Sequence, residues 1–462
     1  MPPPEWEAVV GLEVHAHLKT RTKMFCRCAL EYGAPENTQT CPVCLAHPGA
    51  LPVPNARAIE MTILLGLALD CEIAERAIFA RKNYFYPDLP KGYQISQYEE
   101  PLCGVGRFRL PEGREIGIVR AHLEEDAAKT VHAGGATGRS VGADYSLVDF
   151  NRGGTPLLEI VSAPDLRSAE EAMWFLRLLR QTIVELGISD AEMEKGTLRA
   201  DVNVSVRRRG EEGFRPRWEI KNMNSFTFIG RAIDAAFRQQ VAAHEAGEEV
   251  VQSTYDYDAD TDRLTVHRSK EEADDYRYFP EPDLVPVEPP VELVERLRGE
   301  VPERPSDRIV RLADKLGLEA AAELVTTGNE WKAEALAGEG VEWKAAAAIA
   351  MNRGDFRRDN AAALARIVQA NVTREALDEA FAAAEAGPID AEEYLSRTAV
   401  ADESELEPVI EAVLAAHPEQ VETYRGGKEG VLGFLVGQVM RETQGKADPK
   451  VVNRLLLEKL RG

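Results

Sequence analysis

The segment from Gly11 to Leu18 alternates strictly between apolar and polar residues, the pattern of a β-strand with one buried face. Its apolar residues would point to one side of a sheet: Leu12, Val14, Ala16 and Leu18. The other side would carry Glu13, His15 and His17, with Glu13 and His15 about 6.6 Å apart at the usual strand rise. A carboxylate beside two imidazoles suits a metal ion, a proton or a phosphate. A water-facing edge strand explains this segment alone equally well.

Further segments with the same alternation are also predicted to be strands: Ile118–Glu125, Leu157–Val161, Gly196–Arg207 and Arg217–Lys221. In the first of these, Val119, Ala121 and Leu123 form the expected apolar set. If all the strands share one sheet, one face packs on helices and the other becomes a polar floor. Besides Glu13 and His15, the floor would hold Arg120, His122, Glu124, Glu159, Arg199, Asp201, Asn203, Glu219 and Lys221.

Such a floor favours metal-assisted phosphoryl transfer. Carboxylates with a His suit Mg²⁺ or Mn²⁺, and interleaved Arg and Lys suit phosphate. The alternative is a water-facing sheet with surface ion pairs. The sequence has no Walker A motif, so ATP would bind here in an uncommon way.

Two loop-like segments extend this interpretation. Residues 81–98 are dense in Tyr, Lys and amides, which suits a nucleotide or an RNA end, or else a packed loop with buried tyrosines. Gly153 and Gly154 are expected to form a turn, with a close backbone approach to phosphate as the alternative.

Helical periodicity predicts three helices in the N-terminal part, over Asn55–Asp70, Arg167–Gly187 and Ser225–Ala246. The first has Asn55 as its expected cap, and the second starts with a capping-box pattern at Ser168. Five prolines between residues 278 and 290 predict an extended linker or a domain edge. After it the strand patterns disappear, which indicates an α/β domain followed by helical domains.

Four of the six cysteines are clustered, as Cys26-Arg-Cys28 and Cys41-Pro-Val-Cys44. Four thiolates on two close loops suit a tetrahedral Zn²⁺ that leaves no position for a substrate, which predicts a structural zinc site over residues 26–44. Unliganded thiols and an iron–sulfur cluster are the alternatives. Cys71 and Cys103 are expected to be ordinary buried thiols.

The chain of 462 residues has a net charge of −23, which argues against non-specific nucleic-acid binding over its whole surface. Residues 411–462 differ, because eight Lys and Arg against seven Asp and Glu give them a charge of +1. No signal peptide and no apolar run long enough to span a bilayer is evident, so the protein is predicted to be soluble and cytoplasmic.

Together these segments resemble the B subunit of the aspartyl/glutamyl-tRNA amidotransferase, the GatB family, over essentially the whole chain. Besides the four cysteines, the motifs that carry the resemblance are Gly11–His15, Arg81–Asp88, Gln94–Gln97, His122–Asp126, Val148–Pro156, Gly196–Arg199 and Glu219–Phe226. The ending Gly437–Leu460 resembles the tail shared with YqeY-like proteins. The motifs are long and mutually ordered, so the resemblance is specific.

The resemblance implies an α/β (α+β) cradle-type catalytic domain with a mostly antiparallel sheet over residues 1–290. An all-α helical domain over 291–390 and a YqeY-like, tRNA-binding helical tail over 391–462 would follow. It also implies an ATP-dependent carbon–nitrogen ligase with glutamine as amide donor. The ligase would be a heterotrimer in which an amidase (A) subunit and a small (C) subunit join this chain.

In that reaction, the B subunit phosphorylates the side-chain carboxylate of Glu-tRNA(Gln) or Asp-tRNA(Asn). Ammonia channelled from the amidase partner then gives Gln-tRNA(Gln) or Asn-tRNA(Asn). ATP is the implied substrate, Mg²⁺ the cofactor and Zn²⁺ a structural ion. A non-discriminating aminoacyl-tRNA synthetase is a further candidate partner.

The floor and the resemblance together give five candidates for the catalytic Mg²⁺ cluster, Glu13, His15, Glu124, Glu125 and Glu159, and leave open which of Glu124 and Glu125 binds the metal. The candidates for binding substrate or nucleotide are Lys82, Tyr84, Arg152, Arg199, Asp201 and Lys221. The candidates for phosphate contacts of tRNA are Lys428, Arg441, Lys446, Lys450, Arg454 and Lys459. His17 stands where the family often has an amide or a carboxylate, and we expect it to face solvent or to lie behind the metal ligands.

Two other classes of protein remain open at this point. A non-catalytic scaffold that presents tRNA to a partner enzyme would also suit a zinc loop, a helical tail and the lack of a standard ATP motif. A free-standing ATP-dependent amide ligase is the third possibility, although no ammonia-producing or adenylate-forming motif is evident. The polar floor discriminates between a catalytic subunit and a scaffold, because a scaffold has no need of Glu13, His15 and Glu124 facing one another.

Overall fold

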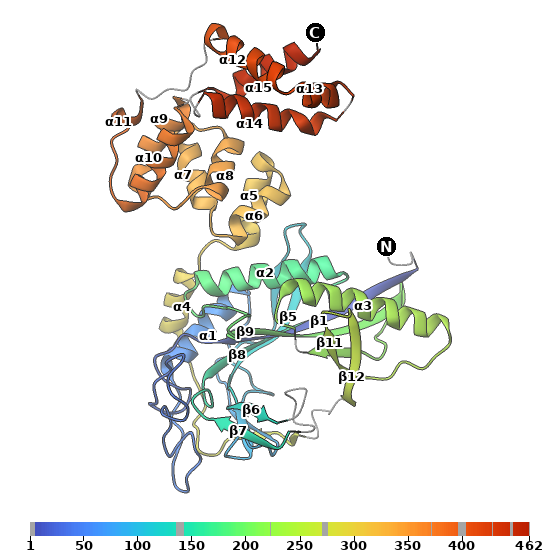
Figure 1. Ribbon diagram of the computed structural model, residues 1–462. Helices are drawn as coiled ribbons and strands as arrows, with labels where there is room; N and C mark the ends of the chain where they lie inside the picture. Colours follow the sequence, from blue (N-terminus) through green and yellow to red (C-terminus); the bar gives the residue numbers. More distant parts are fainter. Residues whose placement is uncertain are drawn as a thin grey trace. The chain divides into compact units, whose positions relative to one another are not determined.

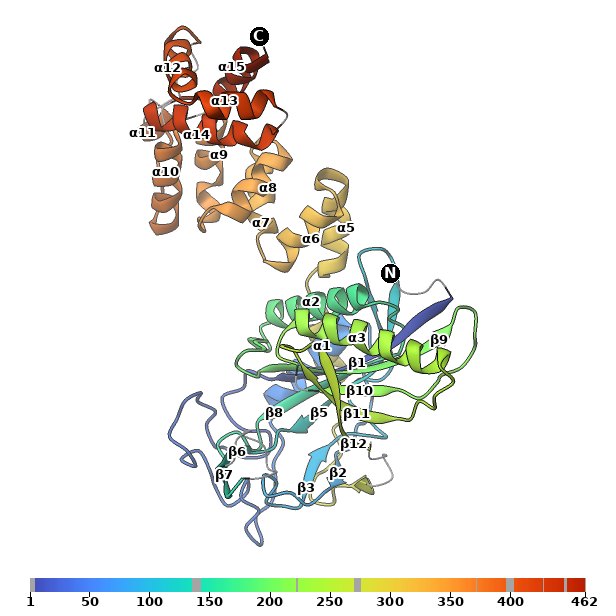
Figure 2. The same cartoon turned by 45° about the vertical axis from the view of Figure 1, so that its right-hand side comes forward.

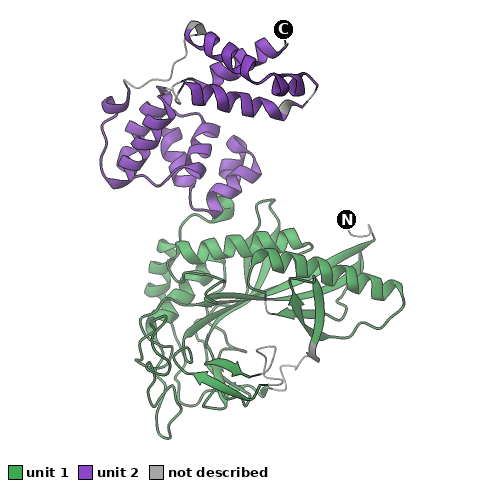
Figure 3. Ribbon diagram, viewed as in Figure 1, with its two compact units in different colours: residues 1–308 green, residues 309–462 purple. Residues whose placement is uncertain are grey.

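The computed structural model describes residues 5–134, 143–221, 223–269, 276–370, 372–395, 403–426, 428–443 and 447–461. The chain divides into two compact units, residues 1–308 and residues 309–462 (Figure 3). The limits expected for three domains, at residues 290 and 390, stay a prediction.

Up to residue 300 the described chain consists mainly of strands with a few helices among them, and it is helical afterwards. The strands are β1 (Trp6–His17), β2 (Ala80–Asn83), β3 (Tyr93–Ser96), β4 (Gly106–Arg109), β5 (Glu115–Glu125), β6 (Lys129–Ala133), β7 (Tyr145–Asp149), β8 (Pro156–Ser162), β9 (Leu198–Arg208), β10 (Trp218–Lys221), β11 (Ser253–Asp258), β12 (Arg263–Ser269) and β13 (Phe279–Pro280). The helices among them are α1 (Ala56–Ala68), α2 (Ala169–Glu185), α3 (Phe226–Glu245) and α4 (Val291–Glu300).

One large sheet organises the first unit. Its strand order is β12-β11-β10-β9-β1-β8-β5-β4, and every neighbouring pair is antiparallel except β10 and β11. Helices α2 and α3 lie on one side of this sheet, and the small sheets β13-β2-β3 and β6-β7 lie on the other (Figures 1 and 2). This arrangement, with helices following it, confirms the predicted fold class.

The alternation along the chain decides which side chains enter the core. On β1, Leu12, Val14 and Ala16 are 1%, 1% and 0% exposed. All five predicted strands are present and belong to the large sheet. Their polar residues therefore share the face opposite α2 and α3, as the alternation predicts.

The prediction for Val119 was wrong, because this side chain is 43% exposed. A β-bulge between Ile118 and Arg120 leaves Val119 without a register partner on β8. Ile118, which is 1% exposed, joins the apolar set instead. A bulge adds one residue to the strand, so the residues on its N-terminal side point to the face opposite to the one that simple alternation predicts.

The predicted helix starts are confirmed by their caps. The side chain of Asn55 accepts hydrogen bonds from the backbone N–H of Arg57 and Ala58 at the start of α1. Ser168 and Ser225 do the same for α2 and α3, each accepting one N–H from the first turn. These bonds satisfy donors that have no partner inside the helix.

Of the two interpretations of residues 278–290, an extended linker or a domain edge, the linker was wrong. Phe279 and Pro280 form β13, which pairs with β2. Glu281 is buried and accepts two hydrogen bonds from Arg81, at 2.7 and 2.6 Å, and Val287 bridges to Ala77. The prolines therefore shape an edge strand and its continuation within the first unit.

The second unit is helical in its described part. Its elements, with α5 beginning just before it, are α5 (Pro305–Leu316), α6 (Leu318–Thr326), α7 (Glu330–Gly338), α8 (Trp343–Asn352), η2 (Arg358–Asn360), α9 (Ala361–Gln369), α10 (Arg374–Ala386), α11 (Glu392–Leu395), α12 (Glu403–Ala416), α13 (Pro418–Arg425), η3 (Glu429–Val431), α14 (Leu432–Glu442) and α15 (Pro449–Arg461). One apolar core spans residues 324–394 and another spans residues 406–460. No described helix is both long and apolar enough to cross a membrane.

Of the basic residues expected to contact tRNA, Arg441 lies on α14, Lys450, Arg454 and Lys459 lie on α15, and Lys428 lies just before η3. Those that are exposed are Lys428, Arg441, Lys450 and Arg454. Lys459 is half-buried and pairs with Glu411 at 2.6 Å, and Lys446 lies outside the described residues.

Candidate active site

Three neighbouring strands place Glu159 between two imidazoles. Glu159 of β8 lies directly opposite His15 of β1 on one side and His122 of β5 on the other. Glu159 Oε2 is 3.3 Å from His15 Nε2 and 3.8 Å from His122 Nε2. This row follows from strand register, because residues opposite each other on adjacent strands point to the same face.

Two more carboxylates complete the cluster. Glu13 and Glu124 lie 3.8 and 4.0 Å from His15 Nε2. Ser96 of β3 donates its hydroxyl to Glu124 at 3.2 Å, so the small sheet also contacts the cluster. The structure thus brings together Glu13, His15, Glu124 and Glu159, which are four of the five residues expected to bind Mg²⁺.

Burial and neighbouring charges shift the pKa values of the side chains in and beside this cluster. Burial opposes the charged form of His15, but Glu159, Glu124 and Glu13 outweigh it and raise the pKa of His15 to about 9. Burial, followed by repulsion from Glu159, raises the pKa of Glu124 to about 7. Burial lowers the pKa of His122 to about 4. The negative charge that holds a proton on His15 also attracts a divalent cation.

Lys82 faces the cluster from β2. Burial opposes its charge, but Glu124, Tyr278 and Glu159 raise its pKa above the ordinary value. Its ammonium lies 4.9 Å from the centre of the Tyr276 ring, within range of a cation–π contact. Next to Lys82, Arg81 pairs with Glu281 and stacks on Tyr93, so it has a structural role.

A cavity of about 630 Å³ opens over the cluster, within the range of ligand-binding pockets. His15 and Glu124 lie in its wall. Five of the six residues expected to bind substrate or nucleotide also line it: Tyr84, Arg152, Arg199, Asp201 and Lys221. The cavity therefore joins the acidic cluster to cationic groups, as phosphoryl transfer requires.

Asp126 is the main residue that the sequence analysis missed. It is 5% exposed, and its Oδ2 lies 2.7 Å from His17 Nε2, 3.0 Å from Arg199 Nη2 and 3.4 Å from Arg152 Nε. Burial opposes its charge, but His17 and the two arginines hold its pKa well below the ordinary value. His17 is thus paired with Asp126 rather than facing solvent.

Glu125 does not join the cluster. Its neighbour Glu124 points to the floor, so Glu125 points to the other side of β5 by strand alternation. There it pairs with Lys91 and accepts the backbone N–H of Ile95 at 3.0 Å. Glu125 and Lys91 line a separate cavity of about 240 Å³, which Cys26 and Cys44 also line.

Arg152 and Gly154 show how the glycine-rich loop is used. Arg152 donates to the backbone oxygens of Ala127 and Ala128, at 2.9 and 2.8 Å. Gly154 has a φ of +86° and uses both its N–H and its carbonyl within the protein, to Asp126 and Met24. The loop is a turn that fixes Arg152, as expected from its glycines.

Lys221 and Asp201 lie on neighbouring strands at the far side of the cavity. Lys221 Nζ lies 2.9 Å from Asp201 and 3.3 Å from Glu219. Burial opposes its charge, but Asp201 and Glu219 raise its pKa. Asp201 therefore acts first as a partner that keeps Lys221 charged and in place.

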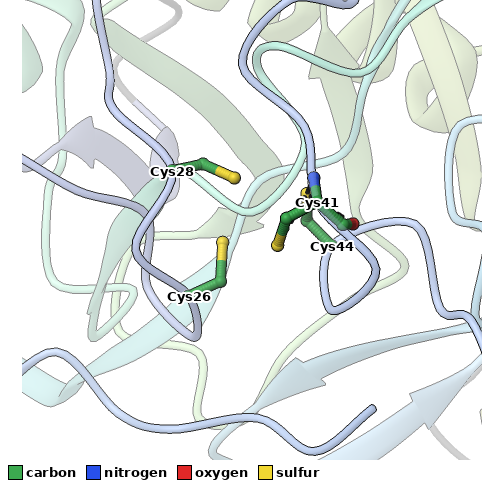
Figure 4. Close-up of side chains that lie close together, drawn as sticks. All are labelled: Cys26, Cys28, Cys41 and Cys44. Atoms are coloured by element: carbon green, nitrogen blue, oxygen red, sulfur yellow. Dashed lines mark hydrogen bonds between the residues drawn. The ribbon is translucent and has the colours of Figure 1, made fainter. Parts of the chain in front are cut away.

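The four clustered cysteines converge as a zinc site would require. Their sulfur atoms all lie within 4.8 Å of one another and point into the space between two loops (Figure 4). The Sγ atoms of Cys41 and Cys44 are 3.9 Å apart, close to the ~3.8 Å that a tetrahedron of Zn–S bonds gives. A hydrogen bond from Cys26 lowers the pKa of Cys44 to about 4, so a thiolate is available. The donor set fits structural Zn²⁺.

Replacing Cys44 with Ser is expected to remove about one zinc per chain. Backbone amides of residues 23–55 should then exchange faster, because metal ligation supplies much of the order in such loops. Mass spectrometry for zinc and hydrogen exchange measure both effects. Cys71→Ala is the matched control, since Cys71 is buried outside the cluster. Retention of zinc by the Cys44 variant would refute the assignment.

Comparison with known families defines the class of the first unit. Residues 8–295 match the family model of the GatB/GatE catalytic domain, and residues 355–460 match that of the GatB domain. The polar cavity and all of the large sheet except the first two residues of β1 lie within the first match. The class is therefore that of GatB/GatE catalytic domains.

Full-length relatives show which family within this class the chain belongs to. A protein of Anaeromyxobacter sp. (strain K), named as the B subunit of an aspartyl/glutamyl-tRNA(Asn/Gln) amidotransferase, is 47% identical over all of both chains. Proteins of the same name from Geotalea daltonii and Moorella thermoacetica are 47% and 44% identical, covering 99% of this chain and 100% of theirs. The chain belongs to the family of amidotransferase B subunits, which confirms the resemblance.

Proposed function

We propose that this chain carries the ATP-dependent site of a tRNA-dependent amidotransferase. There it phosphorylates the side-chain carboxylate of Glu-tRNA(Gln) or Asp-tRNA(Asn) and then directs its amidation. The observation that supports this is the convergence of Glu13, His15, Glu124 and Glu159 beneath a cavity lined with cations. Its relatives are named for the same substrates.

The first step makes an unreactive carboxylate reactive. A carboxylate oxygen of the substrate attacks the γ-phosphorus of ATP, the bond to the β–γ bridging oxygen breaks, and ADP leaves. Arg152, Arg199 and Lys221 line the cavity where charge gathers on the phosphoryl oxygens. Lys82, held charged against Glu124, offers a cation beside the acidic cluster.

The cluster fits a divalent cation, because Glu13, His15 and Glu159 place carboxylate oxygens and an imidazole nitrogen within 4.8 Å of one another, and Glu124 lies 4.0 Å from His15. Glu13, His15, Glu124 and Glu159 would hold Mg²⁺, which neutralises phosphate charge when bound. The cysteine site would hold its ion apart from this chemistry, beside the separate cavity that Glu125 lines.

In the second step, ammonia attacks the acyl carbon and inorganic phosphate leaves, which yields the amide. No covalent nucleophile on this chain is needed. Ammonia would come from glutamine through an amidase (A) subunit, with a small (C) subunit completing the heterotrimer. The exposed cations of α14 and α15, Arg441, Lys450 and Arg454, are proposed to contact tRNA phosphates.

Replacing Glu13 with Ala in the assembled complex is expected to reduce ATP-dependent phosphorylation of Glu-tRNA by at least tenfold, within the ~10–100-fold typical of metal-site changes. Glutamine hydrolysis by the amidase partner measures whether the complex stays assembled. If phosphorylation kept its full rate, the chain would be a tRNA-binding scaffold instead.

A further inference from the structure

The outer end of the cysteine loop, residues 35–39 between the two cysteine pairs, lies against the end of β7 and the residues that follow it. Asn37 makes three hydrogen bonds across this contact. Its Nδ2 donates to the carbonyl of Val148 at 3.1 Å, its Oδ1 accepts the backbone N–H of Phe150 at 2.7 Å, and its backbone N–H donates to the Asp149 carboxylate at 3.0 Å. The Asn37 side chain therefore pairs with this backbone much as a neighbouring strand would.

Asn151 makes the reciprocal contacts. Its Nδ2 donates to the carbonyl of Pro35 and its Oδ1 accepts the backbone N–H of Gln39, both at 2.7 Å. Asn37 has a φ of +59°, a left-handed conformation that Asn adopts more readily than most other residues. The two asparagines thus join two segments that lie at least 111 residues apart in the sequence.

Lys23 and Met24, just before the first cysteine pair, hold the same loop at both of its ends. The ammonium of Lys23, a side chain only 1% exposed, donates to the carbonyl of Phe150 at 2.8 Å. The backbone N–H of Met24 donates to the carbonyl of Gly154 at 2.7 Å. Arg152 therefore lies in a short loop that is bonded to the cysteine-bearing segment before and after it.

Arg152 is the residue of this loop that lines the polar cavity. Its Nε and Nη2 donate to the carbonyls of Ala127 and Ala128. Its Nη1 has no hydrogen-bond partner in the part of the chain that the structure describes. Nη1 is thus the donor left for an oxygen of a ligand in the cavity, and its position depends on the loop that holds it.

We propose that the cysteine loop is a positioning element for the phosphoryl-transfer site, in which Asn37 and Asn151 hold Arg152 in place. The inference rests on the proposed function, in which Arg152 meets the phosphoryl oxygens. One ion held by four thiolates would fix both ends of the loop between Cys28 and Cys41, and would so keep its outer end against the arginine loop. This gives a role to a metal-type site that takes no part in the chemistry.

Replacing Asn37 with Gly in the assembled, zinc-loaded complex tests the proposal. Gly tolerates the left-handed backbone, so only the side-chain hydrogen bonds are lost. We expect kcat/KM for ATP in Glu-tRNA phosphorylation to fall about tenfold, less than the ~10²-fold that a misplacement of 1 Å can cost. In an Arg152→Ala background the same change should cost less than about twofold, because no arginine is left to position.

The matched control is Glu36→Gln, a change in the exposed neighbour of Asn37, which should keep the wild-type kcat/KM. Hydrogen exchange shows where the Asn37 variant is altered. Amides of residues 148–154 should exchange faster, whereas β1 and β8 should keep their protection. Removing zinc with a chelator should reproduce the faster exchange at residues 148–154. If Asn37→Gly itself releases zinc, Asn151→Ala removes the reciprocal bonds and should give the same loss with zinc retained.

A wild-type kcat/KM in Asn37→Gly, or an equal loss with and without Arg152, would overturn the proposal. Its failure differs from failure of the proposed function. If Glu13→Ala slows phosphorylation while Asn37→Gly keeps the wild-type value, the function stands and the positioning role fails. If the wild-type complex does not phosphorylate Glu-tRNA, but Asn37→Gly weakens ATP binding only when Arg152 is present, the positioning role stands and the function fails.

Discussion

Replacing Glu159 with Gln is expected to lower the rate of Glu-tRNA phosphorylation by about 10²–10³-fold, the loss seen when a preorganised charge is removed from an active site. Gln keeps the shape of the side chain and removes its charge. That charge lies 3.3 Å from His15 and 3.8 Å from His122, and the side chain is 9% exposed, so solvent cannot replace it. Single-turnover transfer of the γ-phosphoryl of ATP to Glu-tRNA measures the effect.

The control for Glu159→Gln is Glu170→Gln, an exposed glutamate in the first turn of α2, which should keep the wild-type rate. Circular dichroism and zinc content show whether the Glu159 variant is folded. A folded variant that loses less than threefold would place the chemistry elsewhere in the cavity.

Much of the polar floor could be predicted because strand alternation is local. Side chains two residues apart on a strand share a face whatever the neighbours are. Glu13 with His15, and Glu124 with His122, are therefore paired by sequence spacing alone. The row across β1, β8 and β5 needed in addition that these strands be neighbours in a particular register, which the structure shows.

Other features depend on contacts between distant segments and could not be predicted. The β-bulge at Val119 changes which side chains of β5 face the core, and no distinctive residue at that position marks the bulge in the sequence. Lys91 meets Glu125 across 34 residues, and Asp126 meets Arg199 across 73. The signal for Asp126 was present, since it directly follows two glutamates in a motif. Its partners only become evident once β1, β5 and β9 are placed in one sheet.

Replacing Asp126 with Asn is expected to destabilise the first unit by about 3 kcal/mol. Removing one partner of a buried ion pair typically costs ~3–5 kcal/mol, and the low end applies because Arg152 and Arg199 remain partly solvated. Hydrogen exchange of peptides from β1 and β5 reports the stability of this unit separately from the helical unit. Asp190→Asn breaks an exposed pair with Lys19 and should cost less than ~1 kcal/mol.

The pH dependence of stability distinguishes loss of the Asp126 charge from loss of packing. Its pKa is depressed in the folded chain, so its contribution is complete above the ordinary Asp pKa of ~3.9 and is lost as the pH falls towards the folded pKa. The stability gap between wild type and Asp126→Asn should therefore narrow below about pH 4. If this difference in stability stayed constant down to pH 2, the destabilisation would come from altered packing rather than from the lost charge. Because Asp126 also anchors two arginines in the cavity wall, the same variant should raise KM for ATP.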